Sequence, residues 1–115
     1  ALTLARRHGC VVAVTGDVDF VTDGTRSATI EGGSPLMPKV TALGCALTCL
    51  VGAFAASTPD QPFEATIAAL ALFAVSGEDA ARHARGPGSF QPLFLDALSA
   101  LGSERFDAEA RITML

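Results

Sequence analysis

The spacing of apolar and polar positions changes several times along the chain, and each change marks an expected element. Residues 1–8, "ALTLARRH", carry apolar positions at helical spacing and are followed by Gly9, a residue type that commonly closes helices. This predicts the last turns of an amphipathic helix, without a cap at its start, and so a chain cut from a longer one. The apolar run 10–14, "CVVAV", then indicates a strand buried on both faces, ended by Thr15 and Gly16.

A hairpin is expected next. The pair Asp23-Gly24 separates "DFVT" from "TRSATIE", and such a pair between segments with β-branched residues is a strong hairpin signal. The sheet is therefore predicted to continue from the buried strand into an antiparallel hairpin near its edge. Residues 32–40, "GGSPLMPKV", contain two glycines and two prolines and are expected to be irregular.

Three helices are predicted in the rest of the chain, over residues 42–56, 63–84 and 90–101. The first is free of charge and is expected to be buried. The second begins apolar, and its charged second half is expected to emerge into solvent. Residues 102–115 are predicted to be a loosely attached tail. The expected fold class is thus α/β, with a buried strand, an edge β-hairpin and three following helices.

Composition narrows the classes of partner. Half of the residues are hydrophobic, which is enough for a core, and the net charge of −4 comes with no basic cluster and no Trp or Tyr. Nucleic acid is therefore not an expected partner. The charge-free run 40–59 contains glycines and hydroxyl side chains and is too weakly apolar for a membrane span. The odd number of cysteines, with no disulfide-scaffold spacing, points to a reducing cytoplasm.

The best candidate for chemistry is Cys45, which follows Gly44 in the first turn of the predicted helix 42–56. The N–H groups and the positive dipole end of a helix start suit phosphate, and the same field favours a thiolate, so Cys45 is a candidate base or nucleophile. Short glycine motifs are common by chance, so spacing alone favours a structural role, in which Gly44 allows close packing and Cys45 is a small hydrophobic residue.

No metal site is predicted. Cys45 and Cys49 lie four residues apart, but further ligands at recognisable spacing are missing. The aspartates around the hairpin miss the calcium-loop pattern and are interpreted as turn and edge residues: Asp17, Asp19 and Asp23. The segment 86–89, "GPGS", is interpreted as a break and an N-cap before the third helix.

Three stretches carry a family resemblance: "VVAVTGDVDFVTDG", "GGSPLMPKVTALGCAL" and "ARGPGSFQPLFLDAL". In this order they resemble the C-terminal half of the hydroxyethylthiazole kinase family, which belongs to the ribokinase-like superfamily. The similarity runs over residues 1–101, which are expected to be the C-terminal part of a ribokinase-like kinase domain, and residues 102–115 are expected to be a tail.

The resemblance implies an activity and a set of site residues. It implies ATP-dependent phosphorylation of the hydroxyl of 4-methyl-5-(2-hydroxyethyl)thiazole in thiamine biosynthesis or salvage, with Mg²⁺, in a homotrimer whose sites lie between subunits. It implies ATP contacts at Thr15 and at Gly44 of the phosphate-facing turn, a thiazole contact at Ala42, and the catalytic base at Cys45.

The sequence also departs from the resemblance. The commoner family pattern is Gly-Thr-Gly-Cys, where this chain has Ala42, Leu43, Gly44 and Cys45. The family's upstream half, which supplies the rest of the sheet and most magnesium and phosphate ligands, has no counterpart in these residues, so the isolated chain is expected to be inactive. Leu43 leaves open a non-catalytic α/β module or a degenerate ribokinase-like relative. A sister kinase for another alcohol is less favoured, because superfamily relatives carry aspartate at position 45.

Overall fold

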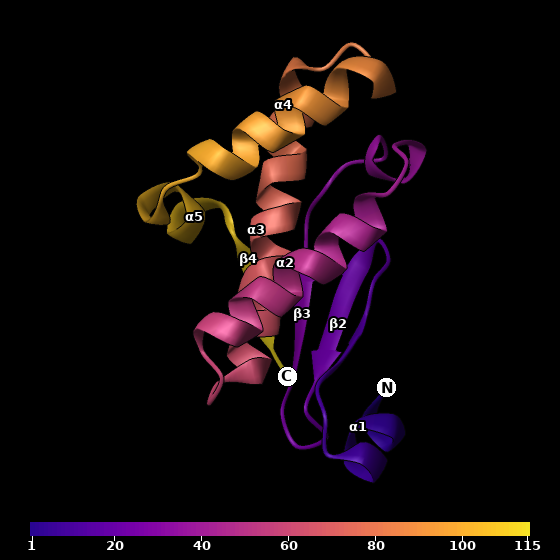
Figure 1. The fold of residues 1–115 in the computed structure, drawn as a ribbon, viewed down its shortest axis with the longest axis vertical. Coiled ribbons are helices and arrows are strands. Elements are labelled where there is room, and N and C mark those ends of the chain that lie inside the picture. The colour runs from indigo at the N-terminus through magenta and orange to yellow at the C-terminus, as the bar shows by residue number, and fades with distance from the viewer.

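The computed structural model describes all residues from Ala1 to Leu115 and confirms the α/β class, with four strands and five helices (Figure 1). The elements follow in the order α1 (Leu2–His8), β1 (Val12–Val14), β2 (Val18–Thr22), β3 (Ser27–Glu31), a 3-10 helix η1 (Met37–Lys39), α2 (Leu43–Ser57), α3 (Pro62–His83), α4 (Pro87–Ala100), α5 (Ser103–Glu109) and β4 (Arg111–Met114). The predicted helices are all present, and Gly9 ends α1 in the left-handed conformation with φ 60°.

The helix α3 is the centre of the fold, because it packs against the sheet on one side and against α2 and α4 on the other. On the sheet side, Val21, Ala28 and Ile30 are almost fully buried against α3 residues such as Phe63. A second apolar cluster forms where α2 and α4 meet α3. It contains an edge-to-face aromatic pair, Phe73 and Phe94, whose ring centroids are 4.7 Å apart, and three further buried residues, Leu43, Ala80 and Phe90.

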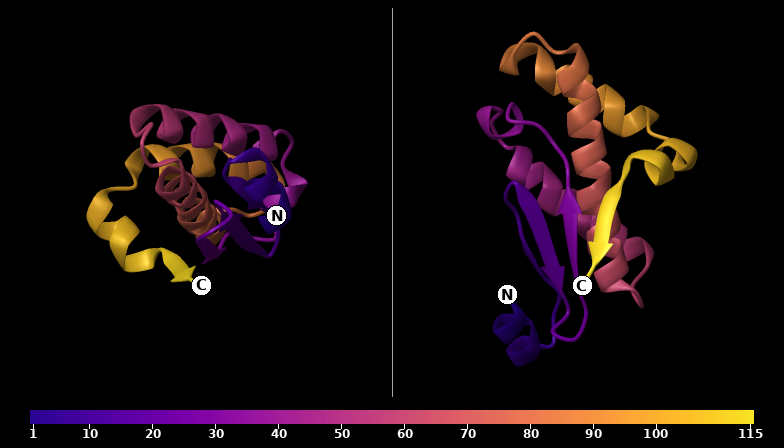
Figure 2. Two further views of the ribbon diagram at one scale, coloured as in Figure 1. Left: turned by 90° about the horizontal axis from the view of Figure 1, so that it is seen from below. Right: turned by 180° about the vertical axis from the view of Figure 1, so that it is seen from behind.

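The positions predicted for two parts of the sheet are wrong: the strand after Gly9 was expected in the buried interior of the sheet, and the hairpin was expected near its edge. The sheet is antiparallel in the order β1-β2-β3-β4, so β1 lies at an edge and the β2–β3 hairpin lies in the middle (Figure 2). Ala13 and Val14 of β1 are exposed rather than buried. An apolar run signals that a strand tends to be covered, but it does not say by which segment. Within this chain no strand pairs with the outer edge of β1.

The helix α2 also differs from expectation, because Leu43 is its single buried residue, and Cys45 and Cys49 are both exposed. It contacts α3 along one side, and its other side has no partner within the chain. The charged half of α3 emerges only in part. Glu78 and Asp79 are half-buried, since each forms an ion pair with the C-terminal segment.

Residues 102–115 are not a loose tail. They form α5 and β4, and β4 pairs with β3 in a register that places Ile112 opposite Ile30. Three ion pairs connect the segment to α3: Arg105 to Asp79 at 2.6 Å, Glu109 to Arg82 at 3.5 Å, and Arg111 to Glu78. The sequence of this segment is short and largely polar, so it gave no strand signal. The strand β4 forms because its backbone pairs with the free edge of β3. A domain boundary at residue 101 remains a prediction. None of the helices combines the length and apolar character needed to cross a membrane.

Candidate functional site

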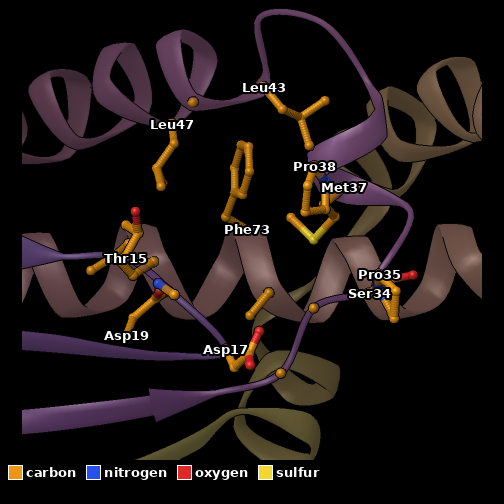
Figure 3. Close-up of a pocket in the computed structure, with 16 residues that line it drawn as sticks. Thr15, Asp17, Asp19, Ser34, Pro35, Met37, Pro38, Leu43, Leu47 and Phe73 are labelled. Carbon is orange, nitrogen blue, oxygen red and sulfur yellow. The ribbon is translucent and has the colours of Figure 1, made fainter.

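A cavity of about 690 Å³ opens between the β1–β2 turn, the segment that follows β3 and the start of α2 (Figure 3). The α3 side chains Leu70, Phe73 and Ala74 form its apolar floor. The turn and the start of β2 contribute Thr15, Gly16, Asp17 and Asp19. The rest of the wall comes from residues 32–35, from Met37 and Pro38, and from the α2 residues Leu43, Gly44 and Leu47. Segments far apart in the sequence therefore meet at one concave surface, which is where small ligands usually bind.

The β1–β2 turn is held by a side chain. The N–H of Gly16 donates to Oδ1 of Asp19 at 3.0 Å, and Figure 3 shows Asp19 directly beside Thr15. Burial raises the pKa of the Asp19 carboxyl, and the hydrogen bond from Gly16 opposes that rise. Thr15 is exposed and lies on the cavity wall.

The start of α2 presents unpaired N–H groups. The first backbone bond of the helix runs from the N–H of Ala46 to the carbonyl of Ala42, and no side chain caps the helix. The N–H groups of Leu43, Gly44 and Cys45 therefore have no acceptor within the helix. Together with the positive end of the helix dipole they form a place suited to an anion, and Gly44 lines the cavity at this point.

Ala42 adopts an unusual backbone conformation. Its φ of 67° places it in the left-handed region, and it is the one residue other than glycine with a positive φ in the chain. This conformation costs an L-residue about 1–2 kcal/mol, a cost that glycine does not have. Glycine at this position would adopt the same conformation without this cost.

Leu43 anchors the helix start. Its side chain is buried in the cluster that includes Phe73 and Phe90, and it also lines the cavity. Leu43 therefore places an apolar group in the core beneath the turn, and the turn itself keeps its free N–H groups.

The structure places the predicted site residues in two groups. Thr15 and Gly44 both lie on the cavity wall. Ala42 and Cys45 flank the cavity without lining it, and both are exposed on the open side of the α2 start. The cavity and the cysteine are thus adjacent but face different surroundings within this chain.

Sequence reasoning missed the far wall and floor of the cavity. The sulfur of Met37 lies between two glycines, Gly33 and Gly77. A Cβ atom built on Gly33 would lie 3.0 Å from the sulfur, and one built on Gly77 would lie 2.5 Å from it. A glycine inside the pattern of a long helix is a recognised sign of close approach, so Gly77 could have pointed to this contact. Phe73 gave no such signal, since its spacing indicated only a core position.

The residues present do not fit a magnesium site. No group of three or more His, Cys, Asp or Glu side chains lies together in the structure. Of the two aspartates at the cavity, Asp17 is exposed at the wall and Asp19 already accepts the hydrogen bond of the turn. The carboxylates of this cavity therefore do not provide the set of oxygen ligands that Mg²⁺ needs.

The fold and the cavity define a class: an α/β domain with a ligand cleft between a strand turn and an uncapped helix start. The sequence model of the hydroxyethylthiazole kinase family matches residues 1–104. Relatives named hydroxyethylthiazole kinase are 64% identical over 115 residues in Rhizobium rhizogenes and 66% identical over 114 residues in Rhizobium etli. The chain belongs to the hydroxyethylthiazole kinase family.

A solved structure agrees with this assignment. The hydroxyethylthiazole kinase of Pyrococcus horikoshii superposes with a TM-score of 0.94 at 36% identity over 99% of this chain. The aligned part covers 100% of this chain for the Rhizobium rhizogenes relative and 99% for the other two. It spans 43% of the Rhizobium rhizogenes relative and 44% of each of the other two. The match is therefore to less than half of each relative.

Proposed function

We propose that this chain is the C-terminal part of a kinase that phosphorylates the hydroxyl of 4-methyl-5-(2-hydroxyethyl)thiazole with ATP, in thiamine biosynthesis or salvage. Membership of the family supports the reaction class. The observation that carries the proposal is the uncapped start of α2, whose free N–H groups meet a 690 Å³ cavity at Gly44. Backbone donors at a helix start are the groups that phosphoryl transfer requires at this place.

The proposed division of labour follows the two groups of residues. ATP occupies the cavity, with the Thr15 hydroxyl on one wall and the N–H groups of Leu43, Gly44 and Cys45 receiving the charge that develops on the transferred phosphoryl group. The alcohol approaches from the open side, where Ala42 and Cys45 are exposed. Cys45 accepts the hydroxyl proton as the alcohol oxygen bonds to the γ-phosphorus and the bond to ADP breaks.

The site is proposed to be completed by parts outside this chain. Ala42, Cys45 and most of α2 are exposed, and a charge-free helix with an exposed side is a surface that normally packs against something. This supports packing of α2 against a further part of the protein, and we propose that the whole kinase is a homotrimer with sites between subunits. Magnesium enters as the ion of the ATP co-substrate, and the three free thiols are consistent with a cytoplasmic location. A vestigial cleft is not favoured, because Leu43 packs in the core and leaves the turn intact.

Two glycine substitutions in the full-length kinase test the proposal. A Cβ atom on Gly44 or on Gly52, both in α2, would meet nothing within 4 Å. Gly44→Ala puts a methyl group at the cavity wall, so we expect the KM for ATP to rise about tenfold, equivalent to about 1.4 kcal/mol, without loss of stability. Gly52→Ala is the matched control and should leave this KM unchanged. Equal ATP affinity in the two variants would contradict the proposed ATP site.

A further inference from the structure

The backbone pairing of β1 and β2 stops one step short of the cavity. Val12 pairs with Thr22, Ala13 with Val21 and Val14 with Phe20. By the same register the next pair is Thr15 opposite Asp19, but β1 ends at Val14. Thr15 and Gly16 thus reach the cavity wall beyond the end of the strand, where the ladder no longer holds them.

Asp19 provides the contact that the ladder does not. Its own backbone sits in the middle of the sheet, since Asp19 pairs with Ile30 of β3. From this fixed position its Oδ1 accepts the Gly16 N–H at 3.0 Å. A carboxylate is a strong acceptor for a backbone N–H, and burial around Asp19 leaves its side chain partly shielded from water.

We propose that Asp19 is a positioning residue for the nucleotide: it holds the Thr15–Gly16 turn in the conformation that presents Thr15 to the cavity. The inference rests on the proposed function, because it takes the ligand of the cavity to be ATP. Asp19 also lines the cavity, but its Oδ1 is the acceptor of the Gly16 N–H, so we expect it to act through the turn. Its loss then weakens ATP binding and leaves the handling of the alcohol nearly unchanged. Cys45 and Ala42 lie on α2, away from this turn.

The chain contains a matched control in the next turn. Asp23 caps the β2–β3 turn in the same way, with its Oδ1 accepting the N–H groups of Thr25 at 2.9 Å and Arg26 at 2.7 Å. That turn does not line the cavity. Asp23→Ala therefore removes turn hydrogen bonds of the same kind at a place where the nucleotide is not expected.

The experiment measures four variants of the full-length kinase: Asp19→Ala, Asp19→Asn, Thr15→Val and Asp23→Ala. For each, the KM for ATP, the KM for the thiazole alcohol, kcat and the melting temperature are determined. We expect Asp19→Ala and Thr15→Val each to raise the KM for ATP by about tenfold and to change the KM for the alcohol less than about twofold, a difference of about 1.4 kcal/mol for ATP. Asp19→Asn keeps an oxygen acceptor for Gly16 and should stay close to wild type.

The split between the two KM values separates positioning from simple destabilisation. A partly unfolded population lowers the apparent kcat but leaves KM values unchanged, so Asp23→Ala should lower the melting temperature without changing the KM for ATP. The inference is overturned if Asp19→Ala keeps the wild-type KM for ATP, if Asp19→Asn is as impaired as Asp19→Ala, or if Asp23→Ala raises that KM equally. An unchanged KM for ATP in Thr15→Val would instead overturn the proposed ATP contact itself, and the inference with it.

Discussion

The sulfur of Met37 lies so close to the backbone of α3 at Gly77 that a Cβ atom on Gly77 would lie 2.5 Å from it. The same sulfur lies 3.0 Å from the position of a Cβ atom on Gly33. Met37 is thereby wedged between the loop after β3 and the central helix, and it forms one wall of the cavity. A flexible thioether is suited to fill a gap of this shape.

This contact predicts that the effect of Gly77→Ala depends on Met37. With Met37 present, the added methyl group has to displace the sulfur, and overpacking of this kind typically costs about 1–3 kcal/mol of unfolding free energy. In a Met37→Ala background the methyl group has room, and the change should instead be neutral or stabilise the helix by up to about 1 kcal/mol. Urea unfolding of the four proteins of this double-mutant cycle measures the difference. The same cost of Gly77→Ala in both backgrounds would show that the two residues do not compete for space.

Ala42→Gly is expected to stabilise the protein. The left-handed conformation at φ 67° costs alanine about 1–2 kcal/mol, which glycine avoids, while the more flexible unfolded chain returns about 0.4–1 kcal/mol of that gain. A net gain of about 0.5–1 kcal/mol should therefore appear in chemical unfolding. The same exchange at Ala46, inside α2, is the control and should cost about 0.5–1 kcal/mol. A loss of stability in Ala42→Gly would mean that this backbone conformation is not retained.

The hydrogen bonds of the Asp23 carboxylate should make part of the free energy of unfolding depend on pH in the acid range. Hydrogen bonds from the backbone N–H groups of Arg26 and Thr25, together with the Arg26 side chain, lower the pKa of Asp23 to about 2. In unfolded chains this carboxyl titrates near 3.9, so its contribution is fully present above about pH 4 and is lost as the pH falls towards 2. The stability difference between wild type and Asp23→Asn should shrink over that window in thermal unfolding. A difference that stays constant down to pH 2 would contradict the assignment.

At Asp19 we expect the pH dependence of folding stability to have the opposite sign to that at Asp23. Its pKa is raised by burial, so its ionised form is less favourable in the folded protein than in the unfolded chain. Relative to Asp19→Asn, wild type should lose stability as the pH rises through the pKa of Asp19. Measuring both variants in one pH series checks the two signs against each other.

The proposed role of Cys45 as the catalytic base predicts the effect of replacing it. If its sulfur accepts the alcohol proton, Cys45→Ala should lower kcat of the full-length kinase by about 10²–10⁴-fold and affect the KM for ATP less, because the N–H groups of the turn remain. Cys45→Asp should retain more activity than Cys45→Ala, since a carboxylate restores an acceptor.

Cys49 lies one turn further along α2 and is likewise exposed, which makes Cys49→Ala a matched control for the loss of a thiol. It should leave turnover nearly unchanged. Full activity in Cys45→Ala, or loss of activity in Cys49→Ala alone, would show that Cys45 is not the base.

Local pattern determined much of this protein. The helices α1 to α4 were predictable because their apolar spacing and their stops, such as Gly9 and the segment 58–62, act over a few neighbouring residues. The family assignment followed from three motifs in order. A helix start with outward N–H groups near Gly44 and Cys45 was expected from the glycine-containing turn that leads into an apolar run. Each of these features depends on interactions within about one or two turns of the chain.

Tertiary structure decided the rest, because the remaining features depend on which distant segments meet. β4 forms at its position because it pairs with the edge of β3. Ion pairs with α3 hold the segment there, among them Arg111 with Glu78 and Arg105 with Asp79. The pairing of β4 with β3 moves the hairpin to the middle of the sheet and leaves β1 at its edge. The cavity likewise joins a strand turn, a loop and two helices, and the wedge of Met37 against Gly77 spans forty residues of sequence. No periodicity in the sequence encodes contacts at that separation, so only the folded chain shows them.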